Sequence, residues 1–357
     1  MNTKADSKTS SIRNKIICFI AAFLLAVLTI ATVLKGGGIS ADELIASIRN
    51  ASVPGLIASI LGMLGFIYFE GAALTVIVRS TGYPARHSRG FVYAAADIYF
   101  SAVTPSASGG QPASAFFMIN DGIPAVVVMA ALLLNLIMYT MAIFTIGLFA
   151  ILLFPEIFLH FSPICKVLII IGIFTLIGLT FLFYLLLRRQ RLLQRLALGC
   201  ASILERLHCR HIAAKIRHKL DQALTEYSEC VDLIFGKKKM LAQVYLLNLL
   251  QRLSQLMVTV FTFCAIHGNP SKIMELFATQ IYVVLGSNSV PVPGSMGVTD
   301  YLMLNGYMEL MTKDQAYRLE ILSRGLSFYV CMMISMITTG LGYLLLKKRK
   351  RGNNKKE

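Results

Sequence analysis

Apolar residues run in long stretches along the whole chain, and short polar segments separate them. A helix needs about 20 apolar residues to cross the hydrocarbon core of a bilayer. Six stretches meet this length and are predicted to be full transmembrane helices, at residues 16–34, 54–78, 124–153, 164–187, 241–266 and 319–346. The pattern predicts an all-α, polytopic membrane protein, with one domain covering residues 1–357.

Two further apolar segments, at residues 91–121 and 273–312, are each interrupted by proline and glycine. The first break reads "TPSASGGQP" (104–112) and the second "VPVPGSMG" (290–297). Neither half of either segment is long enough to span the membrane. Non-helical backbone at membrane depth is tolerated only where protein buries it or where it lines a wet cavity. We therefore expect two re-entrant hairpins of broken helices.

Threading the chain through these elements makes the hairpins enter from opposite sides of the membrane. The halves 1–153 and 164–346 then form an approximate inverted repeat. In transporters, paired Gly/Pro-interrupted segments at corresponding positions point to a binding site near the midplane. Half-helix starts in such a site carry partial positive charge suited to an anion such as phosphate. An alternative is that both hairpins serve only packing.

Composition and charge support a membrane protein. The chain is 56% hydrophobic, its mean hydropathy is +0.68 and its net charge is +16. Of the 34 Lys and Arg residues, 26 fall in the segments 1–15, 79–89, 188–240 and 347–357, which the threading places on one side. This positive-inside pattern predicts cytoplasmic termini in the cell membrane and no nucleic-acid partner. The segment 188–240 reads as a basic amphipathic helix on the membrane surface or as a soluble helical hairpin.

Ionisable residues within apolar segments are costly and are therefore candidates for function. The candidates in membrane segments are Glu70, Asp97, Arg252, Asp300 and Arg324, with Asn248 and Gln251 on the helical face that carries Arg252 and Gln255. We expect Arg252 and Arg324 to face one cavity. When this cavity is empty, each arginine should pair with Glu70, Asp97 or Asp300. During transport, a lipid phosphate should compete with these carboxylates for the arginines. Fixed ion pairs between helices are the alternative.

No metal or cofactor site is expected. The seven cysteines contain no CxxC pair, and Cys200, His208, Cys209 and His211 match no standard zinc spacing. The sequence also lacks the HExxH motif and an HxxxD acyltransferase pair.

The breaks carry a family resemblance. "TPSASGGQPASAFFMINDGIP" and "SNSVPVPGSMGVTDYLML" resemble the two signatures of the lysylphosphatidylglycerol synthase transmembrane family, also called flippase-like. The resemblance covers essentially the whole chain. It implies that the breaks contribute to substrate binding, through Thr104, Pro105, Gly109, Gly110 and Gln111 in the first and Pro293, Gly294, Gly297 and Asp300 in the second. Gln111 stands where the family usually has Glu, and Asp300 where Glu is common.

The resemblance also implies a function. The multiple peptide resistance factor, a member of this family linked to antimicrobial peptide resistance, uses the domain to flip aminoacylated phosphatidylglycerol outward, whereas a separate cytoplasmic domain makes the lipid. We expect this chain to translocate a phospholipid, to lack the synthase activity, and to depend on a separate lipid-synthesising enzyme if the substrate is aminoacylated. A phosphatidylglycerol lysyltransferase or other lipid-modifying enzyme is the first alternative, and a small-solute transporter the second. A homo-oligomer is compatible with the sequence.

Overall fold

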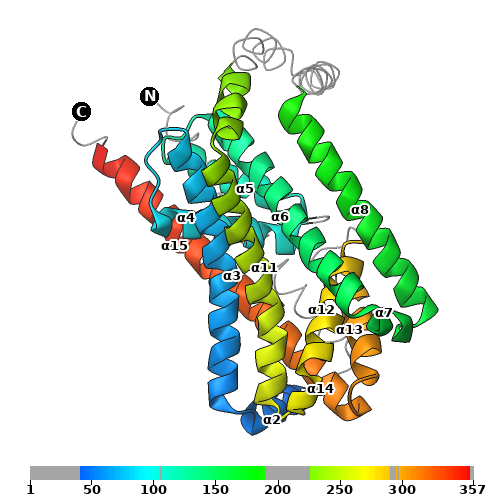
Figure 1. Cartoon of the computed structure of the whole chain (residues 1–357). Coiled ribbons are helices and arrows are strands. Elements are labelled where there is room, and N and C mark those ends of the chain that lie inside the picture. Colours follow the sequence, from blue (N-terminus) through cyan, green and yellow to red (C-terminus); the bar gives the residue numbers. More distant parts are fainter. Residues whose placement is uncertain (1–40, 105–106, 190–225, 290–294, 296, 354–357) are drawn as a thin grey trace, which may run out of the picture.

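The computed structural model describes residues 41–104, 107–189, 226–289, 295 and 297–353 (Figure 1). These residues form helices and no strands, which confirms the all-α prediction. The described helices include α2 (Ala41–Asn50), α3 (Val53–Ser80), α4 (His87–Val103), α5 (Gly110–Asn120), α6 (Ala125–Leu153), α7 (Pro155–His160), α8 (Pro163–Arg188), α11 (Lys238–Ala265), η2 (Pro270–Lys272), α12 (Ile273–Ser287), α13 (Val298–Met308), α14 (Lys313–Arg324), η4 (Gly325–Val330) and α15 (Cys331–Asn353).

Five of the described helical segments are long and apolar enough to cross a membrane. They are α3, α6, α8, α11 and the continuous unit from α14 through η4 to α15, and they match five of the six predicted spans. The sixth prediction, at residues 16–34, lies outside the described residues. The protein is therefore a polytopic membrane protein, as the hydropathy pattern predicts.

Both interrupted segments form the expected hairpins. Helices α4 and α5 make hairpin 1, and helices α12 and α13 make hairpin 2. Hairpin 1 packs mainly on α3 and α15, whereas hairpin 2 packs on α6, α8 and α11. Pro105, Pro293 and Gly294, which belong to the predicted breaks, lie outside the described residues.

The two hairpins start from opposite ends of the molecule (Figure 1). At the base of hairpin 1, Asp121 lies 3.6 Å from Arg89 and 3.8 Å from Arg349 of α15. The loop into hairpin 2 follows the other end of α11, where the Ser52 N–H donates to the Ala265 carbonyl at 2.7 Å. We call the end that carries Asp121 the basic end and the end that carries Ala265 the distal end.

The two largest apolar cores of the described residues divide the protein in the same way. The core at the basic end joins hairpin 1 to the facing parts of α3, α6 and α11. The core at the distal end joins hairpin 2 to α8 and to the other halves of α6 and α11. Each hairpin is therefore anchored in a core of its own, and α6 and α11 run through both.

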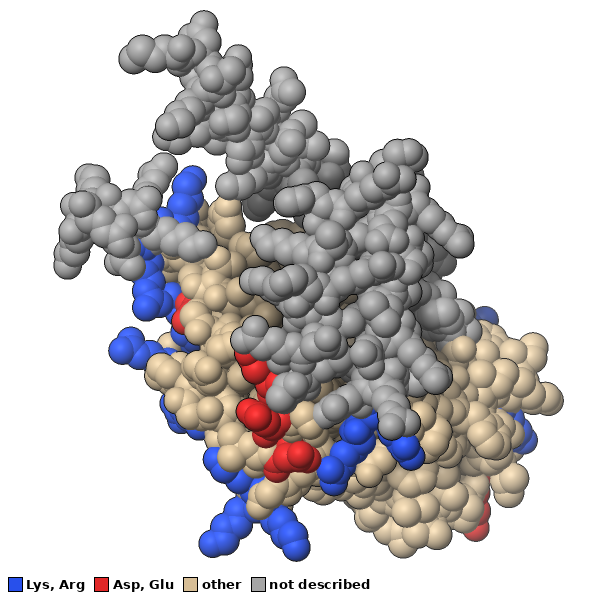
Figure 2. Space-filling model, turned by 90° about the horizontal axis from the view of Figure 1, so that it is seen from above, with Lys and Arg blue, Asp and Glu red and all other residues tan. Residues whose placement is uncertain are grey.

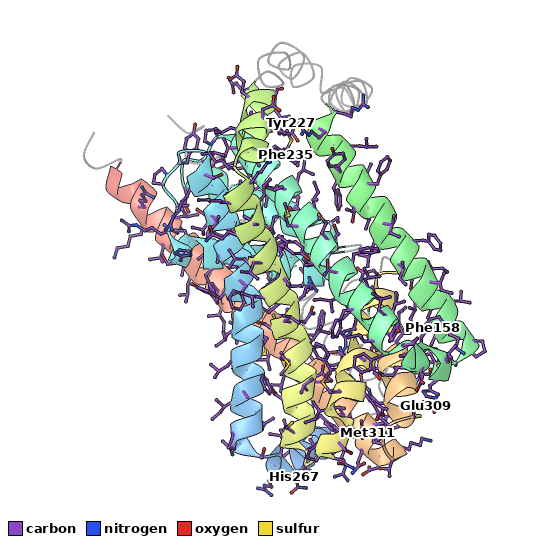
Figure 3. All side chains as sticks on the ribbon, in the orientation of Figure 1. Phe158, Tyr227, Phe235, His267, Glu309 and Met311 are labelled. Atoms are coloured by element: carbon purple, nitrogen blue, oxygen red, sulfur yellow. The ribbon has the colours of Figure 1, made fainter. Side chains whose placement is uncertain are left out.

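The basic end also carries the described part of the predicted amphipathic segment. Residues 226–236 are helical, and Tyr227, Cys230, Val231 and Ile234 are buried in the core at this end. Figure 3 shows Tyr227 and Phe235 at this end and His267 at the distal end. Residues 190–225, with the disfavoured zinc candidates Cys200, His208, Cys209 and His211, lie outside the described residues.

Seen from the basic end, Lys and Arg side chains lie around the margin of the molecule, and a group of acidic side chains lies nearer its middle (Figure 2). The basic residues of this end come from the ends of α3 and α8, the start of α11 and the last turns of α15. The described parts of the predicted basic segments thus lie at one end, whereas residues 1–15 and 190–225 lie outside the described residues.

Candidate functional site

The break in hairpin 1 is closed by Thr104, which follows the last residue of α4. Its hydroxyl donates to the Phe100 carbonyl at 2.5 Å and accepts the Gly109 N–H at 2.9 Å. Ala107, between them, adopts φ +54°, a left-handed conformation that is uncommon outside glycine. Thr104 and Gly109 therefore hold α4 and α5 together at the break.

Gly110 begins α5 directly against Asp97 of α4. A Cβ at this position would overlap the Asp97 carboxylate and the Ser101 hydroxyl, so only glycine allows this approach. The start of a helix carries partial positive charge, and Asp97 supplies a carboxylate beside it. Asp97 therefore places a carboxyl group of the protein beside this half-helix start.

A group of polar residues extends from Asp97 into the helix bundle, and we call Glu70, Asp97, Gln111, Gln251 and Arg252 the first polar centre. Asp97 accepts hydrogen bonds from Gln111 Nε2 at 2.7 Å and from the Ser101 hydroxyl at 3.1 Å. Glu70 Oε2 accepts from Gln251 Nε2 at 2.9 Å, and the carboxyl groups of Glu70 and Asp97 are close enough to interact electrostatically. The centre joins α3, hairpin 1 and α11.

Arg252 is buried beside these carboxylates, yet it has no ion-pair partner within 4 Å among the described residues. Its guanidinium carbon lies 3.7 Å from the centre of the Tyr139 ring and 5.4 Å from that of Phe66. Its Nη1 donates to Gln255 Oε1 at 2.5 Å, and its Nε has no hydrogen-bond partner. Aromatic faces and one amide therefore stand where a carboxylate was expected.

Several buried polar atoms near the first polar centre lack partners. They are Gln111 Oε1, Gln251 Oε1, Asn248 Oδ1 and Arg252 Nε. Asn248 itself donates to Asn135 Oδ1 at 3.1 Å and to the Val244 carbonyl at 3.0 Å. Buried polar groups are rarely left unpaired in native proteins, so these atoms indicate a place that takes up water or a polar ligand.

Hairpin 2 has a comparable arrangement, and we call Asp300, Glu320 and Arg324 the second polar centre. Asp300 Oδ2 accepts the N–H of Gly297, which has φ +78°, at 2.9 Å and so caps the start of α13. Its Oδ1 lies 2.7 Å from Arg324 Nε. Glu320, one turn before Arg324, lies within hydrogen-bond range of Asp300. This carboxylate thus both caps its half-helix and binds an arginine.

The structure brings the sequence candidates together in two centres. Arg324 pairs with Asp300, as one of the expected ion pairs, whereas no carboxylate lies within ion-pair distance of Arg252. The pocket that Arg252 lines does not include Arg324, and the expectation that both arginines face one cavity stays a prediction.

The sequence reasoning missed Asn135 and Tyr139 of α6, which contact Asn248 and Arg252. They stand four residues apart and so share a helical face, a spacing that could have identified them.

Two pockets adjoin these elements. The first lies between α6, α11 and α12, has space for about one water, and is lined by Arg252, Gln255 and the apolar residues Ile143, Ile146, Leu256, Ile281 and Val284. The second, of about 630 Å³, lies at the distal end between α7 and hairpin 2. Glu156, Glu275, Glu309 and His160 line it together with apolar side chains; Figure 3 labels Glu309 and, on α7, Phe158.

Comparison with known families agrees with this architecture. Residues 19–335 match the model of the lysylphosphatidylglycerol synthase TM region. The chain belongs to this family. Both breaks and both polar centres of this lysylphosphatidylglycerol synthase TM-region protein lie inside the matched residues. No curated protein gives a significant match to the chain.

Proposed function

We propose that this protein translocates phospholipids between the two leaflets of the cell membrane, with both termini in the cytoplasm. Membership of the lysylphosphatidylglycerol synthase TM-region family gives a membrane protein of lipid modification or transport. The two opposed hairpins, each with a polar centre at its break, favour transport because such breaks bring hydrophilic groups to membrane depth.

The observation that carries the proposal is the state of Arg252. It is only 5% exposed, has no ion pair within 4 Å among the described residues, and lines a pocket whose other walls are mostly apolar. A buried guanidinium is costly unless a ligand or water satisfies it. A lipid phosphate would supply the missing acceptors, because guanidinium and phosphate form paired hydrogen bonds.

The lining of the distal pocket is suited to a phospholipid that moves through the protein. Its apolar wall, formed by Leu152, Leu153 and Leu310 among others, adjoins carboxylates from Glu156, Glu275 and Glu309. An amphiphile with a polar headgroup has both kinds of surface. We therefore propose that the headgroup passes from Arg252 toward this pocket while the acyl chains remain in the bilayer.

The proposed substrate is phosphatidylglycerol or its aminoacylated form. The headgroup phosphate is common to both, and Arg252 would bind it in either case. The carboxylates of the distal pocket would favour a headgroup that carries an ammonium group. An aminoacylated substrate would require a separate lipid-synthesising enzyme as a partner.

Reconstitution of the full chain in liposomes tests this function. Fluorescent phosphatidylglycerol in the inner leaflet should become accessible to dithionite faster than in protein-free vesicles. Arg252→Ala should reduce this rate at least tenfold, and Arg252→Lys should leave an intermediate rate because lysine retains the charge without the planar fork. Arg318→Ala is the matched control, since Arg318 is half-exposed and its ion-pair partner among the described residues is Asp314 on the same helix.

Two results would contradict the proposal. Equal rates of dithionite access for wild type and Arg252→Ala would show that Arg252 has no role in lipid translocation. A wild-type rate equal to that of protein-free vesicles would show that the protein does not translocate this lipid. Transfer of a labelled lysyl group from tRNA to phosphatidylglycerol by the purified chain would instead establish the enzyme alternative.

A further inference from the structure

We propose that Glu70 and Asp97 form a proton-binding site, in which the two carboxyl groups share one proton between α3 and hairpin 1. This inference does not depend on lipid translocation. It rests on the position of the two side chains, on their hydrogen-bond partners and on the charge that surrounds them.

The two carboxyl groups are close together and removed from water. Glu70 is 7% exposed and Asp97 is 8% exposed, and their side chains are close enough to interact electrostatically. Two ionised carboxylates at this separation repel each other, whereas a carboxyl group and a carboxylate form a strong hydrogen bond. A shared proton therefore satisfies the observed contact.

The remaining partners of this pair do not replace that proton. Gln251 donates one hydrogen bond to Glu70, and Gln111 and Ser101 donate to Asp97. These donors are neutral, so they leave the charge of the pair unchanged. The amide oxygens of Gln111 and Gln251 have no donor of their own, which makes the site rich in acceptors and short of protons.

The charges that face Glu70 and Asp97 also indicate that the pair holds one proton. The charged or titratable groups around it are Arg252 of α11, Tyr139 of α6 and Cys331 of α15. With tyrosine and cysteine neutral, one positive charge faces two carboxyl groups. The first polar centre is neutral when the pair holds one proton, and it carries one negative charge when that proton leaves for water.

The second polar centre differs from the first because an arginine contacts one of its carboxylates directly. There Arg324 contacts Asp300 directly at 2.7 Å, and the Asp300 side chain is 26% exposed. Arg252 makes no such contact with Glu70 or Asp97. At the first centre, unlike the second, no arginine contacts either carboxyl group, and in our proposal a proton joins them instead.

The site is placed to act on hairpin 1. Asp97 lies against Gly110, the first residue of α5, and accepts a hydrogen bond from Gln111 in the first turn of this helix. The charge of the Glu70–Asp97 pair therefore acts electrostatically on the start of α5, at the break of hairpin 1. Loss of the proton places a second negative charge beside Glu70, and the contact between α3 and hairpin 1 weakens. Proton uptake restores it.

Infrared difference spectroscopy of the full chain in lipid tests the proposal without any measurement of transport. The spectrum of wild type minus Glu70→Gln at neutral pH should contain the carbonyl stretch of a protonated carboxyl group, and this band should shift in D2O. The spectrum of wild type minus Asp97→Asn should contain the same band. Each substitution supplies an amide N–H in place of the shared proton, so both variants are expected to fold.

Asp314→Asn is the control, because Asp314 is 73% exposed and pairs with Arg318 on the surface; its difference spectrum should lack the band. The proposal is overturned if the wild type shows no such band relative to Glu70→Gln or Asp97→Asn. It is also overturned if the carboxylate bands respond to added Na⁺ at constant pH, since that result identifies a metal-cation site instead. A protein that moves no lipid can still show the band, so the two proposals fail independently.

Discussion

Gln111 Nε2 donates a hydrogen bond of 2.7 Å to Asp97 Oδ2, and this bond joins the first turn of α5 to α4 across the break of hairpin 1. The donor is an amide where the resemblance leads one to expect a carboxylate. An amide can donate to Asp97 at any pH, whereas a carboxyl group can do so only when it is protonated. Gln111 thus keeps a third carboxyl group away from Glu70 and Asp97.

We predict that Gln111→Glu destabilises the protein by about 1–3 kcal/mol at neutral pH, because a donor is lost and a like charge is added. Thermal unfolding in detergent measures the effect. Lowering the pH should reduce it, since protonation of Glu at position 111 restores a donor. Gln315→Glu, at an exposed position of α14, should change stability little; an equal loss in both variants would contradict the explanation.

Gly110→Ala tests the close approach of α5 to Asp97. The added methyl group would overlap the Asp97 carboxylate and Ser101, so α5 must shift, at a cost of about 1–3 kcal/mol. Gly178→Ala in α8 is the control, because nothing lies within 4 Å of its added Cβ. That control should be neutral or stabilising by up to about 1 kcal/mol, since alanine favours helix. Comparable melting temperatures for the two variants would argue against the contact.

The pair Arg324–Asp300 should contribute more than a surface ion pair. A double-mutant cycle with Arg324→Gln and Asp300→Asn is expected to give a coupling energy of about 1–3 kcal/mol. The same cycle on Lys272–Glu275, whose side chains are both 40% exposed, should give about 0–1 kcal/mol. Thermal unfolding provides both values, and a smaller coupling for Arg324–Asp300 would show that hairpin 2 does not depend on this pair.

Cys230 reports on the packing of residues 226–236 against the basic end. Burial raises the pKa of its thiol, and the thiolate is the reactive form. Alkylation by a maleimide should therefore be slow at neutral pH and should accelerate as the pH rises. Tyr227→Ala, which opens the core beside Cys230, should increase the rate several-fold. Mass spectrometry of the labelled peptide follows the reaction, with the SDS-denatured chain as reference; rapid labelling of the native wild type would contradict this packing.

The sequence was sufficient for the hairpins because proline and glycine mark their breaks directly. It also predicted the polar face of α11, since the spacing of Asn248, Gln251, Arg252 and Gln255 places them on one side of a helix. It could not assign partners across helices. Arg252 contacts Tyr139 rather than a carboxylate because of how α6 packs against α11, and that packing is a tertiary property which no local pattern records.

The bounds and the local geometry of some helices could not be predicted from the sequence either. The last span was expected as one uninterrupted helix over 319–346, yet the structure begins it at Lys313 and places π-helical geometry at Gly325–Val330. A π turn has no characteristic composition, so hydropathy cannot reveal it. Residues 155–160, which lie between two predicted spans, form the short helix α7 because Pro155 at its first turn fixes a helical φ.

The π-helical stretch η4 has a mechanical consequence. It separates Arg324, which holds hairpin 2, from Cys331, which packs in a core cluster with Ala94 and Ala95 of hairpin 1. Because successive helical residues are about 100° apart, each residue gained or lost in this wider coil turns α15 by that angle relative to α14. A one-residue slip in η4 would therefore turn the surface of α15 that supports hairpin 1, while the contact of Arg324 with hairpin 2 stays in place.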